Sequence, residues 1–171
     1  MNIIYSNINS TYSKKIQHEI EGRSITIDLF KSLFPNVAFD EYELYSRYDL
    51  TVTGVTENGT IGKYVIECKV RNIPNFKYNT CYLEYDKYTA ITQSDKADHR
   101  PLYVAYYEDT KNIYVWSLNK INMDEIKKEF RKMKKTTEDD NCNNDQLVYK
   151  QVYYLPLSMA KKYNMKDGIH F

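Results

Sequence analysis

The stretch Tyr48–Arg71, YDLTVTGVTENGTIGKYVIECKVR, decides the fold. Two apolar runs rich in β-branched residues flank Asn58 and Gly59, and an Asn-Gly pair between such runs is the strongest short-range signal for a β-hairpin. Alternate residues of a strand point to opposite faces. We therefore expect Glu67 and Lys69 to share one face of the second strand, with the apolar residues between and beside them on the other.

The polar residues of this hairpin match the needs of metal-assisted phosphodiester hydrolysis. Mg²⁺ prefers hard oxygen ligands at near-octahedral geometry, and Asp49 and Glu67 supply two carboxylates. The backbone carbonyl of Cys68 is a natural third ligand on the same strand. Lys69 could position the attacking water or stabilise the charge of the transition state, and a general-base role stays open.

Length and composition favour a folded globular protein. The 171 residues suffice for one domain with a proper core, and 42% hydrophobic and 15% aromatic residues favour a folded chain over a disordered one. Formal net charge is only +1, from 24 basic and 23 acidic residues. No overall basic field is present, so binding to nucleic acid would have to come from local patches.

The cysteines and the N-terminus indicate a cytoplasmic protein. Cys68, Cys81 and Cys142 are odd in number and lack CxxC spacing, so we expect free thiols in a reducing compartment rather than disulfides or a zinc site. The polar N-terminus has no apolar signal segment, and no apolar run approaches 18 residues. We therefore expect neither secretion nor a membrane span.

Hydrophobic periodicity predicts the remaining elements. A helix capped by Ser13 should run to residue 34, and three strands should follow over 37–47, 48–56 and 63–71. Further helices are expected over 81–92, 122–135 (capped by Asn122) and 156–163. Further strands are expected over 102–107, 112–118 and 147–155, and the first two should form a second hairpin around residues 108–111.

The hairpin resembles a known nuclease family. The runs Tyr48-Asp49-Leu50-Thr51-Val52 and Val65-Ile66-Glu67-Cys68-Lys69 are similar to the motif of the PD-(D/E)xK superfamily, which includes many restriction enzymes and Holliday junction resolvases. Tyr48 stands where the family often has proline. The resemblance implies a single α/β domain with a restriction-endonuclease-like αβββαβ core, a mixed sheet flanked by helices. That core would cover about residues 13–118, with a helix–strand–helix extension over 119–171.

The resemblance also implies further site residues. The family often adds an acidic residue from the first helix, for which Glu19 and Glu21 are candidates. Glu19 is favoured because it lies beside the apolar stripe of that helix, whereas Glu21 falls nearly opposite. Lys87 would contact phosphate from the second helix. Arg71 and Lys77, on the loop that leaves the active strand, would contact nucleic acid.

The resemblance implies a Mg²⁺- or Mn²⁺-dependent endonuclease that acts on DNA, with branched DNA or phage-type DNA processing suggested by analogy. A homodimer would let two sites cut two strands. An RNA endonuclease with the same site and a catalytically silent binding module of the same fold stay open. A surface strand with paired Glu67 and Lys69 would also explain the triplet, although its apolar flanks favour a central strand. No histidine has metal-ligand spacing.

Overall fold

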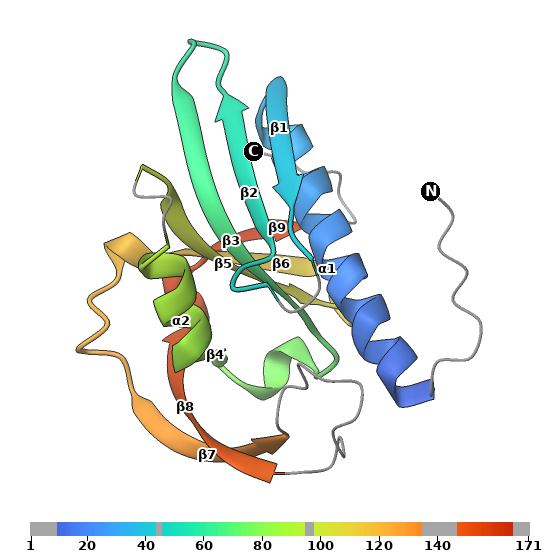
Figure 1. The fold of residues 1–171 in the computed structure, drawn as a ribbon, viewed down its shortest axis with the longest axis vertical. Helices are drawn as coiled ribbons and strands as arrows, with labels where there is room; N and C mark the ends of the chain where they lie inside the picture. The colour runs from blue at the N-terminus through green and yellow to red at the C-terminus, as the bar shows by residue number, and fades with distance from the viewer. Residues whose placement is uncertain (1–9, 44–45, 95–97, 135–146, 166–171) are drawn as a thin grey trace.

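The structure, a computed structural model, describes residues 10–43, 46–94, 98–134 and 147–165. It is an α/β fold built on a six-stranded mixed sheet with the order β1-β2-β3-β5-β6-β9 (Figure 1). The strands of this sheet are β1 (Asn36–Glu41), β2 (Leu50–Val55), β3 (Ile61–Arg71), β5 (Arg100–Tyr107), β6 (Asn112–Ser117) and β9 (Lys161–Asn164).

The predicted hairpin is confirmed. Strands β2 and β3 pair antiparallel, with Val55 opposite Ile61 at the closed end. Thr56 donates its amide hydrogen to the carbonyl of Thr60 (3.0 Å), and Gly59 adopts φ of 79° in the turn. A positive φ strains residues that carry a Cβ, which is why glycine stands there. Strand β3 is central, since it pairs with β2 on one side and, in parallel, with β5 on the other.

Two apolar cores lie on the two faces of this sheet. Helix α1 (Ser10–Leu33) packs on one face, where Leu29 and Phe30 meet Ile66 and Val104. On the other face a second core is shared with α2 (Tyr85–Thr92) and with a second sheet, and Trp116 is wholly buried there. The first helix begins at Ser10, so Ser13 lies inside it rather than at its cap, and the first strand ends at Glu41 instead of residue 47.

The second sheet has three strands in the order β4-β8-β7, namely β4 (Thr80–Glu84), β8 (Leu147–Pro156) and β7 (Lys128–Lys134). The helix expected over 81–92 is wrong in its first four residues, because Cys81 and Leu83 alternate as buried strand residues and α2 starts only at Tyr85. The strand expected over 147–155 is confirmed.

Two other predicted helices are wrong. Residues 128–134 form an edge strand paired along its whole length with β8, and Asn122 accepts the amide of Asp124 (3.3 Å) in a local turn. The helix expected over 156–163 is instead a short 3-10 turn, Leu157–Met159, followed by β9. Pairing with distant strands outweighed local helix propensity in both places.

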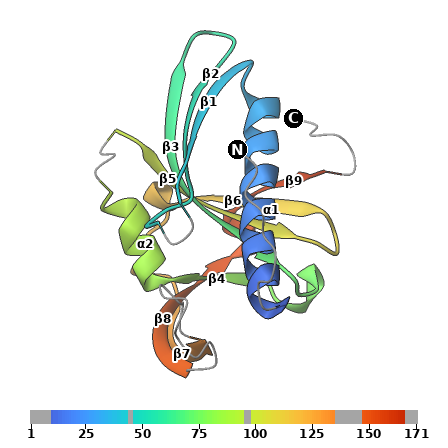
Figure 2. The same cartoon turned by 45° about the vertical axis from the view of Figure 1, so that its right-hand side comes forward.

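The C-terminal extension is not a separate appendage. Strand β8 pairs with β4, and β9 pairs with β6, so residues beyond 119 complete both sheets. The second sheet curves away from the main one in both views (Figure 1 and Figure 2). Across the described ranges, no helix has the length and apolar character needed to cross a membrane.

Candidate functional site

Asp49 sits where β2 begins, and both of its carboxylate oxygens are engaged. Its Oδ2 accepts the backbone amide of Cys68 (2.6 Å), and its own amide donates to the carbonyl of Ile66 (3.0 Å). The residue is 4% exposed. The strand pairing of the hairpin thus fixes this carboxylate against the backbone of the Glu67-Cys68-Lys69 triplet, where the sequence places it.

Glu67 points from the centre of β3 towards α2. The residue is 6% exposed, and its Oε2 lies 3.1 Å from the Nζ of Lys87. No well-directed hydrogen bond reaches that oxygen from any described residue. The same Nζ of Lys87 also lies 3.5 Å from the carbonyl oxygen of Ser46. A buried carboxylate oxygen is therefore held by one ion pair alone.

Arg23 is the residue of the site that sequence reasoning missed. Its guanidinium, with a side chain 7% exposed, lies 2.8 Å from Glu19 and 3.2 Å from Asp49. It also donates to the backbone carbonyls of Tyr42 and Glu43. The signal that could have found it is the i, i+4 spacing of Glu19 and Arg23, which puts both on one face of a helix.

Burial perturbs the carboxyl groups of this cluster. Burial, with a smaller contribution from the nearby charge of Asp49, raises the pKa of Glu67 to about 8, against the opposing effects of Lys87 and Lys69. Burial and Asp49 likewise raise the pKa of Glu19, although Arg23 opposes them. A carboxylate in low dielectric next to a second carboxylate ionises less readily.

The lysines differ in their setting. Burial alone would lower the pKa of Lys87, but the carboxylates of Glu67 and Asp49 outweigh it and raise the pKa above its ordinary value. Lys69 is exposed on β3, two residues beyond Glu67 on the same face of the strand. One lysine is thus locked in an ion pair, while the other is open to solvent beside the carboxylates.

Lys77 and Arg71, the two residues predicted to contact nucleic acid from the loop that leaves the active strand, lie in different environments. Lys77 is exposed, near the ring of Tyr78. Arg71 is buried, and the prediction that it contacts nucleic acid is wrong. Its Nη2 donates to the carbonyl of Tyr82 and to the hydroxyl of Tyr103, each at 2.6 Å, and its guanidinium lies 4.1 Å from the centre of the Tyr82 ring. Arg71, at the end of β3, thus links the main sheet to β4 of the second sheet.

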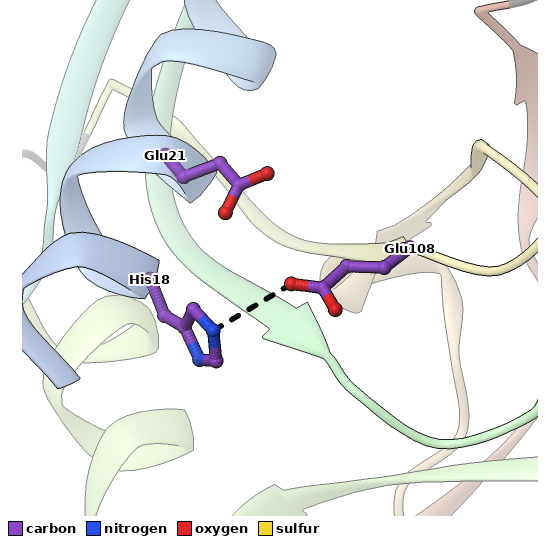
Figure 3. A group of neighbouring side chains, drawn as sticks. All are labelled: His18, Glu21 and Glu108. Carbon is purple, nitrogen blue, oxygen red and sulfur yellow. Dashed lines mark ion pairs between the residues drawn. The ribbon is translucent and has the colours of Figure 1, made fainter. Parts of the chain in front are cut away.

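Among the described residues, one group brings three ligand atoms of histidine, cysteine or carboxylate within 4.8 Å of one another: His18, Glu21 and Glu108 (Figure 3). The Nε2 of His18 lies 3.6 Å from Glu108. Sequence spacing missed this group because Glu108 follows β5, far along the chain. Glu21 thus faces away from Glu19, which the structure places beside Asp49.

Comparison with protein-family models, curated proteins and solved structures finds no match. The chemistry of the site is therefore judged on its own geometry. The cluster joins three carboxylates to three cations from α1, β2, β3 and α2; its members are Glu19, Asp49, Glu67, Arg23, Lys69 and Lys87. Such a cluster can hold a divalent cation and can offer lysine to a phosphate.

Proposed function

We propose that this protein is a Mg²⁺- or Mn²⁺-dependent endonuclease of the PD-(D/E)xK type that hydrolyses phosphodiester bonds in DNA in the cytoplasm. The observation that carries the proposal is the meeting of Asp49, Glu67 and Lys69 with Glu19 and Lys87 at one place, although the five residues come from four elements. Perturbed carboxyl groups with specific charge partners are typical of functional sites.

The residues fit a divalent ion. The Oε2 of Glu67 is buried without a well-directed hydrogen bond from a described residue. Each oxygen of Asp49 makes one contact, with Arg23 or with the amide of Cys68, so lone pairs remain for a cation. Glu19, Asp49 and Glu67 do not bring three carboxylate oxygens within 4.8 Å of one another. In this proposal Asp49 and Glu67 would hold the ion, with the carbonyl of Cys68 as third ligand, and Glu19 would act through the waters of the ion.

A bound Mg²⁺ would supply Lewis acidity towards the phosphate and the attacking water. The chain itself does the rest. Lys69, exposed beside the carboxylates, donates hydrogen bonds to the phosphate and stabilises the charge that develops as water attacks phosphorus and the bond to the leaving oxygen breaks. Lys87 holds the Glu67 carboxylate in place through the 3.1 Å ion pair.

One observation favours a second function, a binding module without catalysis. The guanidinium of Arg23 already lies between Glu19 and Asp49, where it neutralises the carboxylates that would attract a metal. A protein that uses an internal arginine in this way needs no ion to fold. Metal binding separates the two functions, since the silent module would bind none at millimolar Mn²⁺.

The test is cleavage of supercoiled, linear, branched and single-stranded DNA, and of RNA, with Mg²⁺ or Mn²⁺. We expect wild-type protein to cut DNA and the variants Glu67→Gln and Lys69→Ala to lose about 100-fold or more in rate, the scale of losing one electrostatic stabiliser. Glu57→Gln, at the exposed tip of the hairpin, is the matched control and should retain wild-type activity. Cleavage that survives both site substitutions would refute the mechanism, and preferential cutting of RNA would favour the RNA enzyme.

A further inference from the structure

Strands β7 and β8 form a ribbon at the edge of the second sheet, which curves away from the main sheet (Figure 1 and Figure 2). The ribbon is two-stranded over residues 147–151 of β8, because β4 pairs with β8 only from Val152 to Pro156. Seven residue pairs join β7 and β8, from Lys128 opposite Tyr153 to Lys134 opposite Leu147. At about 3.3 Å per residue the paired part is roughly 20 Å long. Strand β7 is an edge, so no further strand of the described chain covers it.

The ribbon concentrates positive charge in a chain that is nearly neutral overall. Four of the seven residues of β7, KEFRKMK, are basic and one is acidic, whereas the whole chain has 24 basic and 23 acidic residues. Lys128, Arg131 and Lys132 are exposed. Lysines are common on edge strands because they discourage edge-to-edge aggregation, but that role does not account for the large apolar side chains exposed between them.

Exposed aromatic side chains lie among these lysines on one face. Directly opposite residues of an antiparallel pair project to the same side, so Phe130 and Lys132 share a face with Tyr149, which lies opposite Lys132. Phe130 is 69% exposed and Tyr149 is 72% exposed. Large aromatic rings open to solvent between cations indicate a surface that contacts a partner.

The same face leads to the candidate site. Lys128 lies over the ring of Tyr153 (5.4 Å), and that ring packs edge-on against Tyr88 of α2 (5.1 Å between centroids). The preceding residue of α2 is Lys87, which pairs with Glu67 at 3.1 Å. A path of neighbouring residues thus runs from Lys128, where the ribbon joins the rest of the second sheet, to the carboxylate cluster.

We infer that the β7–β8 ribbon binds duplex DNA, with Lys128 and Lys132 on phosphates and Phe130 and Tyr149 on the sugars or base edges of a groove. The major groove of B-DNA, about 12 Å wide, admits a two-stranded β-ribbon. A basic strand is complementary to phosphate, and the path to Glu67 would bring the bound duplex to the site. The ribbon's role in cleavage rests on the proposed function, whereas its binding to DNA does not.

Fluorescence anisotropy with a short labelled duplex, in EDTA so that no cleavage occurs, tests the inference. We expect Lys132→Gln to weaken binding about tenfold near 0.1 M salt and to make the slope of log K against log salt less negative by about 1, as for one lost phosphate contact. Lys162→Gln, an exposed lysine on β9 of the other sheet, is the matched control and should match wild type. Phe130→Ala should weaken binding several-fold without changing the salt slope.

Equal binding by Lys132→Gln and Lys162→Gln would overturn the inference, as would absence of duplex binding by the wild-type protein or tighter binding to single-stranded DNA. Both lysines and Phe130 are exposed, so the variants should keep the wild-type thermal transition. The result of the binding measurement can be distinguished from that of the cleavage assay. A protein that binds through the ribbon but cuts nothing refutes the nuclease alone, and one that cuts equally well without the ribbon lysine refutes the ribbon's role in cleavage.

Discussion

Glu67 gives the sharpest prediction, because its carboxyl group has a pKa of about 8 in the folded protein against an ordinary value of 4.5. Below pH 4.5 the group is protonated in both folded and unfolded chains and contributes nothing to pH dependence. Between pH 4.5 and about pH 8 the folded protein retains a proton on Glu67 that the unfolded chain has lost. The free energy of unfolding therefore falls as pH rises through this window, by up to about 1.4 kcal/mol per pH unit.

Glu67→Gln removes this titration. We expect the stability of wild type relative to the variant to fall by a few kcal/mol between pH 5 and pH 8, with roughly 5 kcal/mol as the ceiling that the full pKa difference sets. Urea denaturation of the two proteins at a series of pH values measures it. Glu57→Gln, whose side chain is exposed, controls for the loss of one carboxylate elsewhere.

Magnesium should reverse the effect. An ion held by ionised Glu67 stabilises the folded state in proportion to its occupancy, about 1.4 kcal/mol at ten times the dissociation constant. At pH 8.5 wild type should therefore gain stability with Mg²⁺, and Glu67→Gln should gain much less. A stability difference between wild type and Glu67→Gln that stays flat from pH 5 to pH 8 would contradict the raised pKa of Glu67.

Three other substitutions test particular contacts. Gly54→Ala should cost about 1–3 kcal/mol in urea denaturation, because a Cβ there would lie 2.5 Å from the ring of Phe34; a neutral result would mean that the ring moves freely. Lys87→Met should raise the pKa of Glu67 further, seen as a higher midpoint in the stability profile, since the lysine opposes the upward shift. Arg23→Met should cost about 3–5 kcal/mol without metal, and Mn²⁺ should recover part of that loss, unlike in wild type, if the guanidinium and the ion serve the same carboxylates.

The hairpin was predictable because its signals are local. Asn58-Gly59 fixes the turn, and β-branched residues at period two fix the strands on either side. The positions of Asp49 and Glu67 on neighbouring strands followed directly, since both lie next to the paired residues of that hairpin. The same reasoning identified the antiparallel pair β5 and β6, which is joined by a short polar turn.

The second sheet could not be read from the sequence in this way. Residues 122–135 have the composition of a solvated helix, and only the register with β8, which lies more than a dozen residues further on, makes 128–134 a strand. Local propensity is a weak prior where a distant partner satisfies the backbone. The burial of Arg71 could not be predicted for the same reason, because the acceptors of its hydrogen bonds belong to β4 and β5, which lie further along the chain.

The cost of Glu67 to the fold argues against the surface-strand explanation of the triplet. The residue is 6% exposed in a strand paired on both edges, so it is not a solvated surface charge. Its raised pKa means that ionisation at neutral pH opposes folding, and Lys87 offsets this only in part. An apolar residue or a glutamine there would stabilise the protein. Residues that break local rules at a cost to stability are expected at functional sites, and this one lies beside two further carboxylates and an exposed lysine.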